Sequence, residues 1–246
     1  MTDLTRRRWL AFAVGAVAAV GITPVAAHAA VKSFVAFGDS YTMSFRAGIP
    51  TWADQITAAG EAKMLADMAI SGATAAGVNQ KKTLDGQVDR WIADYKAKGV
   101  PDRTVIYMGN NDVGSGPPSL SATLAQYARQ VDRLIANGVT QGARRLVLCL
   151  LHDWTRNPDS TRNFRPRVKT WNNGLRAIAA ARPNVITVDL FSRFEDVFAH
   201  KSKYGLTNVT VANKPLSATT YLYEDGNHFG RKGHSIIAQE VLPKLV

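Results

Sequence analysis

Short apolar runs alternate with longer amphipathic stretches along most of the chain, a pattern typical of strands followed by helices. The predicted strands are residues 31–37, 63–70, 104–108, 145–151 and 185–190, of which 63–70 is the weakest. The predicted helices are residues 49–59, 85–97, 119–137, 164–181 and 230–246. In the third of these helices, apolar side chains recur at helical spacing at Leu120, Leu124, Tyr127, Val131, Leu134 and Ile135.

This alternation predicts an α/β fold, a three-layer α/β/α sandwich with a mostly parallel five-stranded sheet. In such sheets, ligands bind beyond the carboxyl ends of the strands. Side chains that do chemistry are therefore expected just after the apolar runs. No internal repeat, low-complexity tract or change of composition follows residue 30, so residues 30–246 are predicted to form one domain.

The first 29 residues have the composition of an export signal. Three arginines at positions 6–8 precede an apolar run over residues 11–22, and Ala27 and Ala29 supply the small residues that a signal peptidase prefers. The run is shorter than the roughly 20 residues that a membrane-spanning helix needs. Paired arginines before a bulky apolar pair favour the twin-arginine route to a periplasm or the outside of the cell. A general secretory signal and a permanent anchor are the alternatives.

Composition and charge describe an ordinary globular protein. Of the 246 residues, 46% are hydrophobic and 20% charged, which excludes disorder of the whole chain. The formal net charge is +11, and loss of residues 1–29, with three arginines and one aspartate, leaves +9. The basic residues are scattered, so a solvated basic surface is favoured over a polyanion site. We expect no nucleic-acid partner, at most a weak attraction to anionic surfaces, and a monomer.

The chain lacks the signatures of several common site types. Its single cysteine, Cys149, lies in a strand-like apolar run, so a buried apolar role is expected and an intrachain disulfide is excluded. Neither a phosphate-binding Walker loop nor a His-Glu-x-x-His motif is present, and we expect no metal or organic cofactor. The Gly-x-Ser-x-Gly elbow of ordinary α/β-hydrolases is also missing.

The first predicted strand leads directly into Gly38-Asp39-Ser40. Gly38 permits a tight turn at this point. A serine that opens a helix can be assisted by backbone amides and by the helix dipole, which suits a nucleophile. From this segment alone, a helix N-cap is an equally good interpretation of Ser40.

Two further strand ends carry groups that can donate hydrogen bonds. Gly72 follows the second strand, where its backbone N–H can approach a ligand, although a simple turn explains it as well. The third strand leads into Gly109-Asn110-Asn111-Asp112. An asparagine amide at a strand end can stabilise the oxyanion of acyl transfer, a contribution of roughly 2.7–4 kcal/mol. An Asx turn is the alternative interpretation of this segment.

Before the last predicted helix, Asp225 precedes His228 by three residues. A serine hydroxyl becomes a useful nucleophile when a base takes its proton, and histidine suits that role near neutral pH. A carboxylate such as Asp225 would fix the histidine tautomer. By itself, His228 would be interpreted as a surface histidine near a helix start.

Together, the four segments resemble the blocks of the SGNH (GDSL) hydrolase superfamily. The blocks stand in the family's order, from residue 38 to residue 228, as Gly38-Asp39-Ser40, Gly72, Gly109-Asn110-Asn111-Asp112 and Asp225-Gly226-Asn227-His228. The resemblance implies the flavodoxin-like SGNH fold and serine ester hydrolysis without a cofactor.

The resemblance also implies a role for each matching residue. Ser40 would be the nucleophile, His228 the general base and then acid, and Asp225 the residue that orients His228. The backbone N–H groups of Ser40 and Gly72 and the side chain of Asn111 would form the oxyanion hole. Asp39 is not the acid of the triad in this mapping, and Asn110 fills the family's variable position.

Within the superfamily, the chain is similar to secreted lipases and esterases that include phospholipase/lecithinase/haemolysin-like proteins and carbohydrate acetylesterases. The segments 204–210 and 221–225 carry this likeness. Three features depart from the family pattern. Tyr41-Thr42 follows Ser40 where leucine is usual, Phe229-Gly230 follows His228 where proline and threonine are frequent, and Asp67 replaces a common asparagine.

Three other histidines are assigned lesser roles. His152 follows the fourth strand and is expected at the rim of the cleft, in a structural or substrate-contact role. His234 lies in the last helix, where packing or capping is expected, and His200 is expected at the surface.

The sequence therefore predicts an exported serine esterase or lipase that acts on small-molecule, lipid or acetylated-carbohydrate esters. A carbohydrate O-acetylesterase and a phospholipase or acyltransferase of the same superfamily are the alternatives within the enzyme class. A non-catalytic binding protein on this fold is a third interpretation, which the complete set of Ser40, Asn111, Asp225 and His228 disfavours.

Overall fold

The computed structural model describes residues 31–44, 48–77, 79–114, 119–212 and 219–246. Residues 31–246 form one compact unit, and it is the unit described below. The expected export signal, residues 1–29, lies outside the described residues.

The unit is built on a five-stranded sheet with the order β2-β1-β3-β4-β5, in which every pairing is parallel. The strands are β1 (Ser33–Gly38), β2 (Lys63–Asp67), β3 (Arg103–Tyr107), β4 (Arg145–Cys149) and β5 (Val185–Val188). The prediction of an α/β fold with a mostly parallel five-stranded sheet is confirmed. A separate two-stranded parallel sheet joins β6 (Asn208–Ala212) to β7 (Tyr221–Tyr223), and the sequence pattern had not indicated it.

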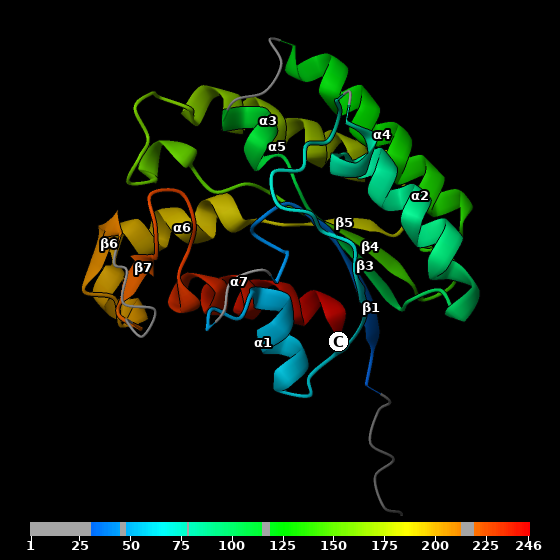
Figure 1. Ribbon diagram of the computed structural model, residues 1–246, viewed down its shortest axis with the longest axis horizontal. Helices are drawn as coiled ribbons and strands as arrows, with labels where there is room; N and C mark the ends of the chain where they lie inside the picture. Colours follow the sequence, from blue (N-terminus) through cyan, green and yellow to red (C-terminus); the bar gives the residue numbers. More distant parts are fainter. Residues whose placement is uncertain (1–30, 45–47, 78, 115–118, 213–218) are drawn as a thin grey trace, which may run out of the picture. The chain divides into compact units, whose positions relative to one another are not determined.

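Helices cover both faces of the sheet (Figure 1). On one face, α1 (Trp52–Ala58) packs against α7 (Arg231–Leu245). On the other, α4 (Leu120–Ala136) contacts both α2 (Leu84–Asp94) and α5 (Arg165–Ala180). The remaining helices are α3 (Asn110–Gly114), α6 (Leu190–Ala199) and the 3-10 turns η1 (Gln80–Lys82), η2 (Lys96–Lys98), η3 (Trp154–Arg156) and η4 (Lys201–Tyr204). No helix in the described part of the chain is both long enough and apolar enough to span a bilayer.

The burial of the strands explains which of them were clear in the sequence. All five residues of β3 are buried, and in β4 only the first is exposed. Strands covered on both faces read as continuous apolar runs. The edge strand β2 has two exposed positions, which is why residues 63–70 gave the weakest pattern. Cys149 is fully buried in β4, as expected, and burial raises the pKa of its thiol.

One predicted strand extends too far and conceals a helix. The run 185–190 was interpreted as strand throughout, but β5 ends at Val188 and α6 begins at Leu190. The Asp189 side chain accepts a hydrogen bond from the backbone N–H of Ser192, so it caps the new helix. The apolar residues of α6 form the buried face of an amphipathic helix. In the sequence they continue the apolar run of the strand, so the pattern does not show where the strand ends.

The strand order places a crevice between β1 and β3. From β1 the chain moves to β2 on one side, and after α2 it crosses to β3 on the other. Ligands of such sheets bind where this reversal occurs, beyond the carboxyl ends of the strands. In the register of the pair, Gly38 lies opposite Tyr107, so the turns that follow β1 and β3 leave the sheet side by side.

Gly38 is needed for close packing and not for its turn. A Cβ at this position would lie 2.6 Å from the carbonyl oxygen of Tyr107 and 2.6 Å from the hydroxyl of Thr42. Its φ is not among the positive values, so the turn conformation itself does not require glycine here. The absence of a side chain lets the turn that carries Ser40 lie directly against the end of β3.

Candidate active site

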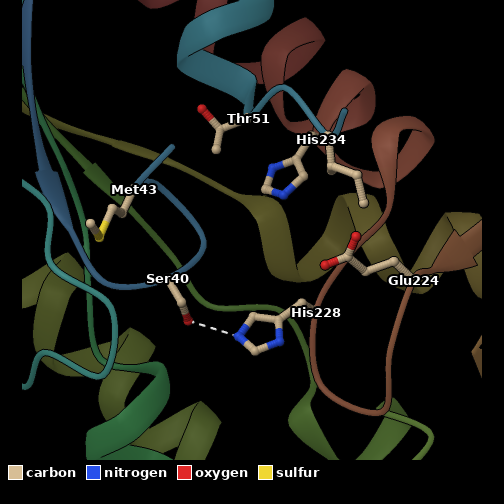
Figure 2. A pocket seen from close by; sticks show the side chains of 7 residues that line it. Ser40, Met43, Thr51, Glu224, His228 and His234 are labelled. Carbon is tan, nitrogen blue, oxygen red and sulfur yellow. Dashed lines mark hydrogen bonds between the residues drawn. The ribbon is translucent and has the colours of Figure 1, made fainter. Parts of the chain in front are cut away.

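Three side chains that the sequence singled out lie in a hydrogen-bonded row. The hydroxyl oxygen of Ser40 is 2.9 Å from Nε2 of His228 (Figure 2). On the other side of the ring, Nδ1 of His228 is 3.0 Å from each carboxylate oxygen of Asp225. A neutral imidazole with its proton on Nδ1 donates to Asp225 and presents Nε2 to Ser40 as an acceptor. This geometry suits transfer of a proton from serine to histidine.

Ser40 lies in a tight turn and not at the start of a helix. The backbone N–H groups of Thr42 and Met43 both donate to the carbonyl oxygen of Asp39, at 3.1 and 3.0 Å. The next helix, α1, begins only at Trp52 and is capped by Thr51. The N-cap interpretation of Ser40 is therefore wrong, and the helix dipole expected to assist it is missing at this turn.

The loop that carries His228 is organised by Asp225. Besides the ring nitrogen, Oδ1 of Asp225 accepts hydrogen bonds from the backbone N–H groups of Asn227 at 2.8 Å and His228 at 2.7 Å. The backbone N–H of Glu224 donates to the carbonyl oxygen of His228 at 3.0 Å, which closes the loop. The three-residue spacing lets one carboxylate hold both the backbone and the side chain of His228.

The backbone donors expected from Ser40 and Gly72 are available. Within the described chain, neither of these two N–H groups has a hydrogen-bond acceptor. Gly72 is exposed and has φ +75°, a conformation that favours glycine. The open N–H groups of two turns at neighbouring strand ends are suited to bind a developing negative charge.

The structure separates the roles of Asn110 and Asn111. The amide of Asn110 is buried, donates to Oδ2 of Asp39 at 3.0 Å and accepts from the Trp154 indole at 3.0 Å. Asn111 is only half-buried, and its amide nitrogen donates to the carbonyl oxygen of Ala73 at 2.8 Å. Asn110 therefore joins two parts of the scaffold, whereas Asn111 lies next to the Gly72 turn. The two residues open the short helix α3 and do not form the Asx turn considered from the sequence.

Two buried carboxyl groups support the turns of the site. Asp39 accepts the backbone N–H of Tyr41 at 3.0 Å, and burial raises its pKa to about 6. Both oxygens of Asp112 accept the backbone N–H of Ala75, at 3.1 and 2.9 Å, and burial raises its pKa to about 7. Asp112 thus ties α3 to the loop that contains Gly72. Desolvation disfavours the charged form of both acids.

A small hollow opens beside Ser40 and His228 (Figure 2). It has about 220 Å³ of empty space, part of it open to solvent. The remaining lining residues are Met43, Ile49, Thr51, Glu224 and His234. The sequence reasoning missed all of these except His234, because they come from three separate segments without a shared motif.

The other histidines are only partly as expected. His200 is exposed and pairs with Asp196, as a surface residue should. His234 is buried on α7, as packing requires, and it also lines the hollow. His152 was expected at the cleft rim, but it is fully buried beneath the site. Burial lowers its pKa to about 4, so its imidazole is neutral near pH 7. In the described ranges, no group of three or more histidine, cysteine or acidic side chains could hold a metal ion.

Comparison with known proteins shows which family the chain resembles. The family model of GDSL-like lipases/acylhydrolases matches residues 34–241. No curated protein matches the chain in sequence.

Solved structures with the same fold include two acetyl xylan esterases and a lipase/acylhydrolase. An acetyl xylan esterase, AlAXEase, superposes with a TM-score of 0.62 at 17% identity, covering 87% of this chain and 100% of its own. An acetylxylan esterase from Geobacillus stearothermophilus gives 0.57 at 20% identity, with coverages of 87% and 94%. A lipase/acylhydrolase from Enterococcus faecalis gives 0.55 at 19% identity, with coverages of 88% and 98%. These similarities establish the SGNH-like fold of the described unit.

The raised pKa of Asp112 predicts a pH-dependent stability. The pKa rises from 3.8 to about 7 on folding, so the folded state binds the proton more tightly than the unfolded chain. Stability linked to this group is complete below about pH 4 and is lost as the pH rises towards 7. The asparagine of Asp112→Asn cannot ionise. The free energy of unfolding of this variant in urea, relative to that of the wild type, should therefore rise by on the order of 4 kcal/mol across this pH range.

The exposed Asp94→Asn variant is the matched control for this substitution. If the Asp112→Asn and wild-type stability curves run parallel from pH 4 to 7, Asp112 is not a buried acid with a raised pKa.

Proposed function

The chain belongs to the GDSL-like lipase/acylhydrolase family of carboxylic ester hydrolases, and on this premise we propose that it hydrolyses esters through a covalent acyl-serine intermediate. The observation that carries the proposal is the hydrogen-bonded row of Ser40, His228 and Asp225. The row lies at the carboxyl end of the sheet, beside the reversal of strand order where such folds bind ligands.

In the proposed first step, the Ser40 oxygen attacks the ester carbonyl carbon while its proton passes to Nε2 of His228. The C–O bond to the alcohol then breaks, and the imidazolium returns the proton to the departing alkoxide. In the second step, water attacks the acyl-enzyme and loses a proton to His228. The C–O bond to Ser40 then breaks, the imidazolium returns the proton to the Ser40 oxygen, and the carboxylic acid is released. Asp225 stabilises the imidazolium and holds the ring in the required tautomer.

The negative charge on the carbonyl oxygen would be bound by three donors. We assign the backbone N–H groups of Ser40 and Gly72 and the side-chain amide of Asn111. An amide nitrogen carries two hydrogens. The bond from Asn111 to Ala73 orients the group next to the Gly72 turn, and we assign the same amide to the oxyanion. Donors positioned before the reaction stabilise the transition state without reorganisation.

The hollow beside Ser40 favours a short acyl group. Its lining includes the apolar residues Met43 and Ile49 and the buried polar residues Glu224 and His234. A long alkyl chain would meet polar groups there, which carries a desolvation cost. The small size of the hollow favours a group such as acetyl, and the acetyl xylan esterases that share the fold act on acetylated carbohydrate. We therefore propose acetylated sugars or similar small acetyl esters as substrates.

We further propose that the mature protein acts outside the cytoplasm after twin-arginine export. The support is the arginine pair at positions 6 and 7, the apolar run that follows and the small residues at Ala27 and Ala29. The single, buried Cys149 means that the domain needs no oxidising compartment in order to fold.

The nucleophile is tested by Ser40→Ala with p-nitrophenyl acetate as substrate. Loss of the serine should lower kcat by at least about 10³-fold, because the acyl-enzyme cannot form. Ser44→Ala, on the exposed continuation of the same turn, is the matched control and should keep the wild-type rate. Undiminished hydrolysis by Ser40→Ala would exclude the proposed mechanism.

The preference for short acyl groups is tested by Ile49→Ala. Removing this buried side chain enlarges the hollow, so the ratio of butyrate to acetate hydrolysis should rise about tenfold. Ile56→Ala on α1 removes an equally buried side chain that does not line the hollow, and should leave the ratio unchanged. A wild-type enzyme that prefers long acyl chains or phospholipids would contradict the proposal.

The export route is tested by replacing both Arg6 and Arg7 with lysine. A twin-arginine substrate should then accumulate inside the cell as the full-length precursor, whereas the wild-type mature protein should begin at residue 30. Unchanged export of the double variant would indicate the general secretory route, and an uncleaved wild-type N-terminus would indicate an anchor.

A further inference from the structure

The peptide bond that precedes His228 is held at both of its polar ends. Its nitrogen, the backbone N–H of His228, donates to Asp225 at 2.7 Å. Its oxygen, the carbonyl of Asn227, accepts a hydrogen bond from the hydroxyl of Tyr41 and another from the Asn157 amide at 3.3 Å. Two donors occupy the two lone pairs of this carbonyl. The orientation of this peptide plane, and with it the direction of the His228 side chain, is therefore set by Tyr41 and Asn157 as well as by Asp225.

Tyr41 links the segment that carries Ser40 to the segment that carries His228. It follows Ser40 directly, and the carbonyl that it binds belongs to the residue directly before His228. Its backbone N–H is bonded to Asp39 at 3.0 Å, so the turn and the ring are held together. The ring is 1% exposed and lies 5.6 Å from the His228 ring, centroid to centroid. A tyrosine hydroxyl here links the serine turn to the histidine loop.

A buried network fixes the direction of the Tyr41 hydroxyl. Oδ1 of Asn157 accepts from the Tyr223 hydroxyl at 3.0 Å and lies 3.1 Å from Nε2 of His152, so this ring nitrogen must carry the proton. Nδ1 of His152 is then the acceptor for the Tyr107 hydroxyl at 3.2 Å. The Nε2 hydrogen of His152 is directed at Asn157, so this nitrogen cannot accept from Tyr41, and the Asn157 amide nitrogen is a donor. The Tyr41 hydroxyl therefore directs its own proton to the carbonyl of Asn227.

We propose that Tyr41 is a positioning residue, whose hydroxyl sets the register of the His228 loop against the Ser40 turn. The inference rests on the proposed roles of Ser40 and His228. Loss of the hydroxyl leaves the Asn227 carbonyl with a single donor, and the histidine loop can shift relative to the serine. Displacements of the order of 1 Å between reacting groups can cost about 100-fold in rate.

The test is Tyr41→Phe, which retains the ring and removes only the hydroxyl. With p-nitrophenyl acetate, kcat should fall about tenfold or more while KM stays within twofold, because the substrate contacts are unchanged. Tyr127→Phe is the matched control. It removes another fully buried tyrosine hydroxyl, on α4 and outside the network, and should keep the wild-type kcat and KM. Circular dichroism and thermal unfolding of each variant establish that the rates belong to folded protein.

The inference is wrong if folded Tyr41→Phe retains the wild-type kcat, or if KM rises and kcat does not fall. If Tyr41→Phe does not fold, Asn157→Ala removes the second donor to the same carbonyl and must lower kcat in the same way. Ser40-dependent hydrolysis by the wild type, with no loss in Tyr41→Phe, overturns this inference alone. Hydrolysis that survives in Ser40→Ala overturns the proposed function instead.

Discussion

Five parallel pairs join β1 to β3, from Phe34 opposite Arg103 to Gly38 opposite Tyr107. Because the two strands end in register, the turn that carries Ser40 and the segment that leads into α3 and Asn111 leave the sheet at the same level. Gly38 lets them touch, since any side chain there would collide with the Tyr107 carbonyl. The other parts of the site depend on this junction. The Gly72 loop is tied to α3 through Asp112, and the His228 loop is tied to the serine turn through Tyr41.

The junction is built from buried polar groups, which carry a cost in stability. Asp39 and Asp112 lie where water cannot reach them, and burial raises the pKa of each carboxyl. Their hydrogen bonds to backbone N–H groups and to Asn110 offset part of that desolvation. An apolar junction would be less costly, but it would not hold several loops in one register, because apolar contacts lack the direction of hydrogen bonds. Buried polar groups therefore concentrate around the reacting atoms.

The sequence predicted the sheet, and it singled out residues that the structure brings together, because both depend on local patterns. Apolar runs marked the strands, and Ser40, Gly72, Asn111 and His228 each stand in or just beyond a recognisable segment. What it did not predict depends on contacts between distant segments. The Tyr41 hydroxyl contacts a carbonyl 186 positions later. His152 is buried by partners on four other segments, namely Tyr41, Tyr107, Phe194 and Phe229. The boundary of β5 was lost because the buried face of α6 continues its apolar run.

The central claim is that Ser40 is a nucleophile activated by His228, and peptide mass spectrometry after fluorophosphonate labelling tests it most directly. The wild-type protein should gain one phosphonate adduct, located on Ser40, and His228→Ala should label at least about 100-fold more slowly, because no base removes the serine proton. An adduct on another residue, or no adduct on folded wild-type protein, would contradict the claim.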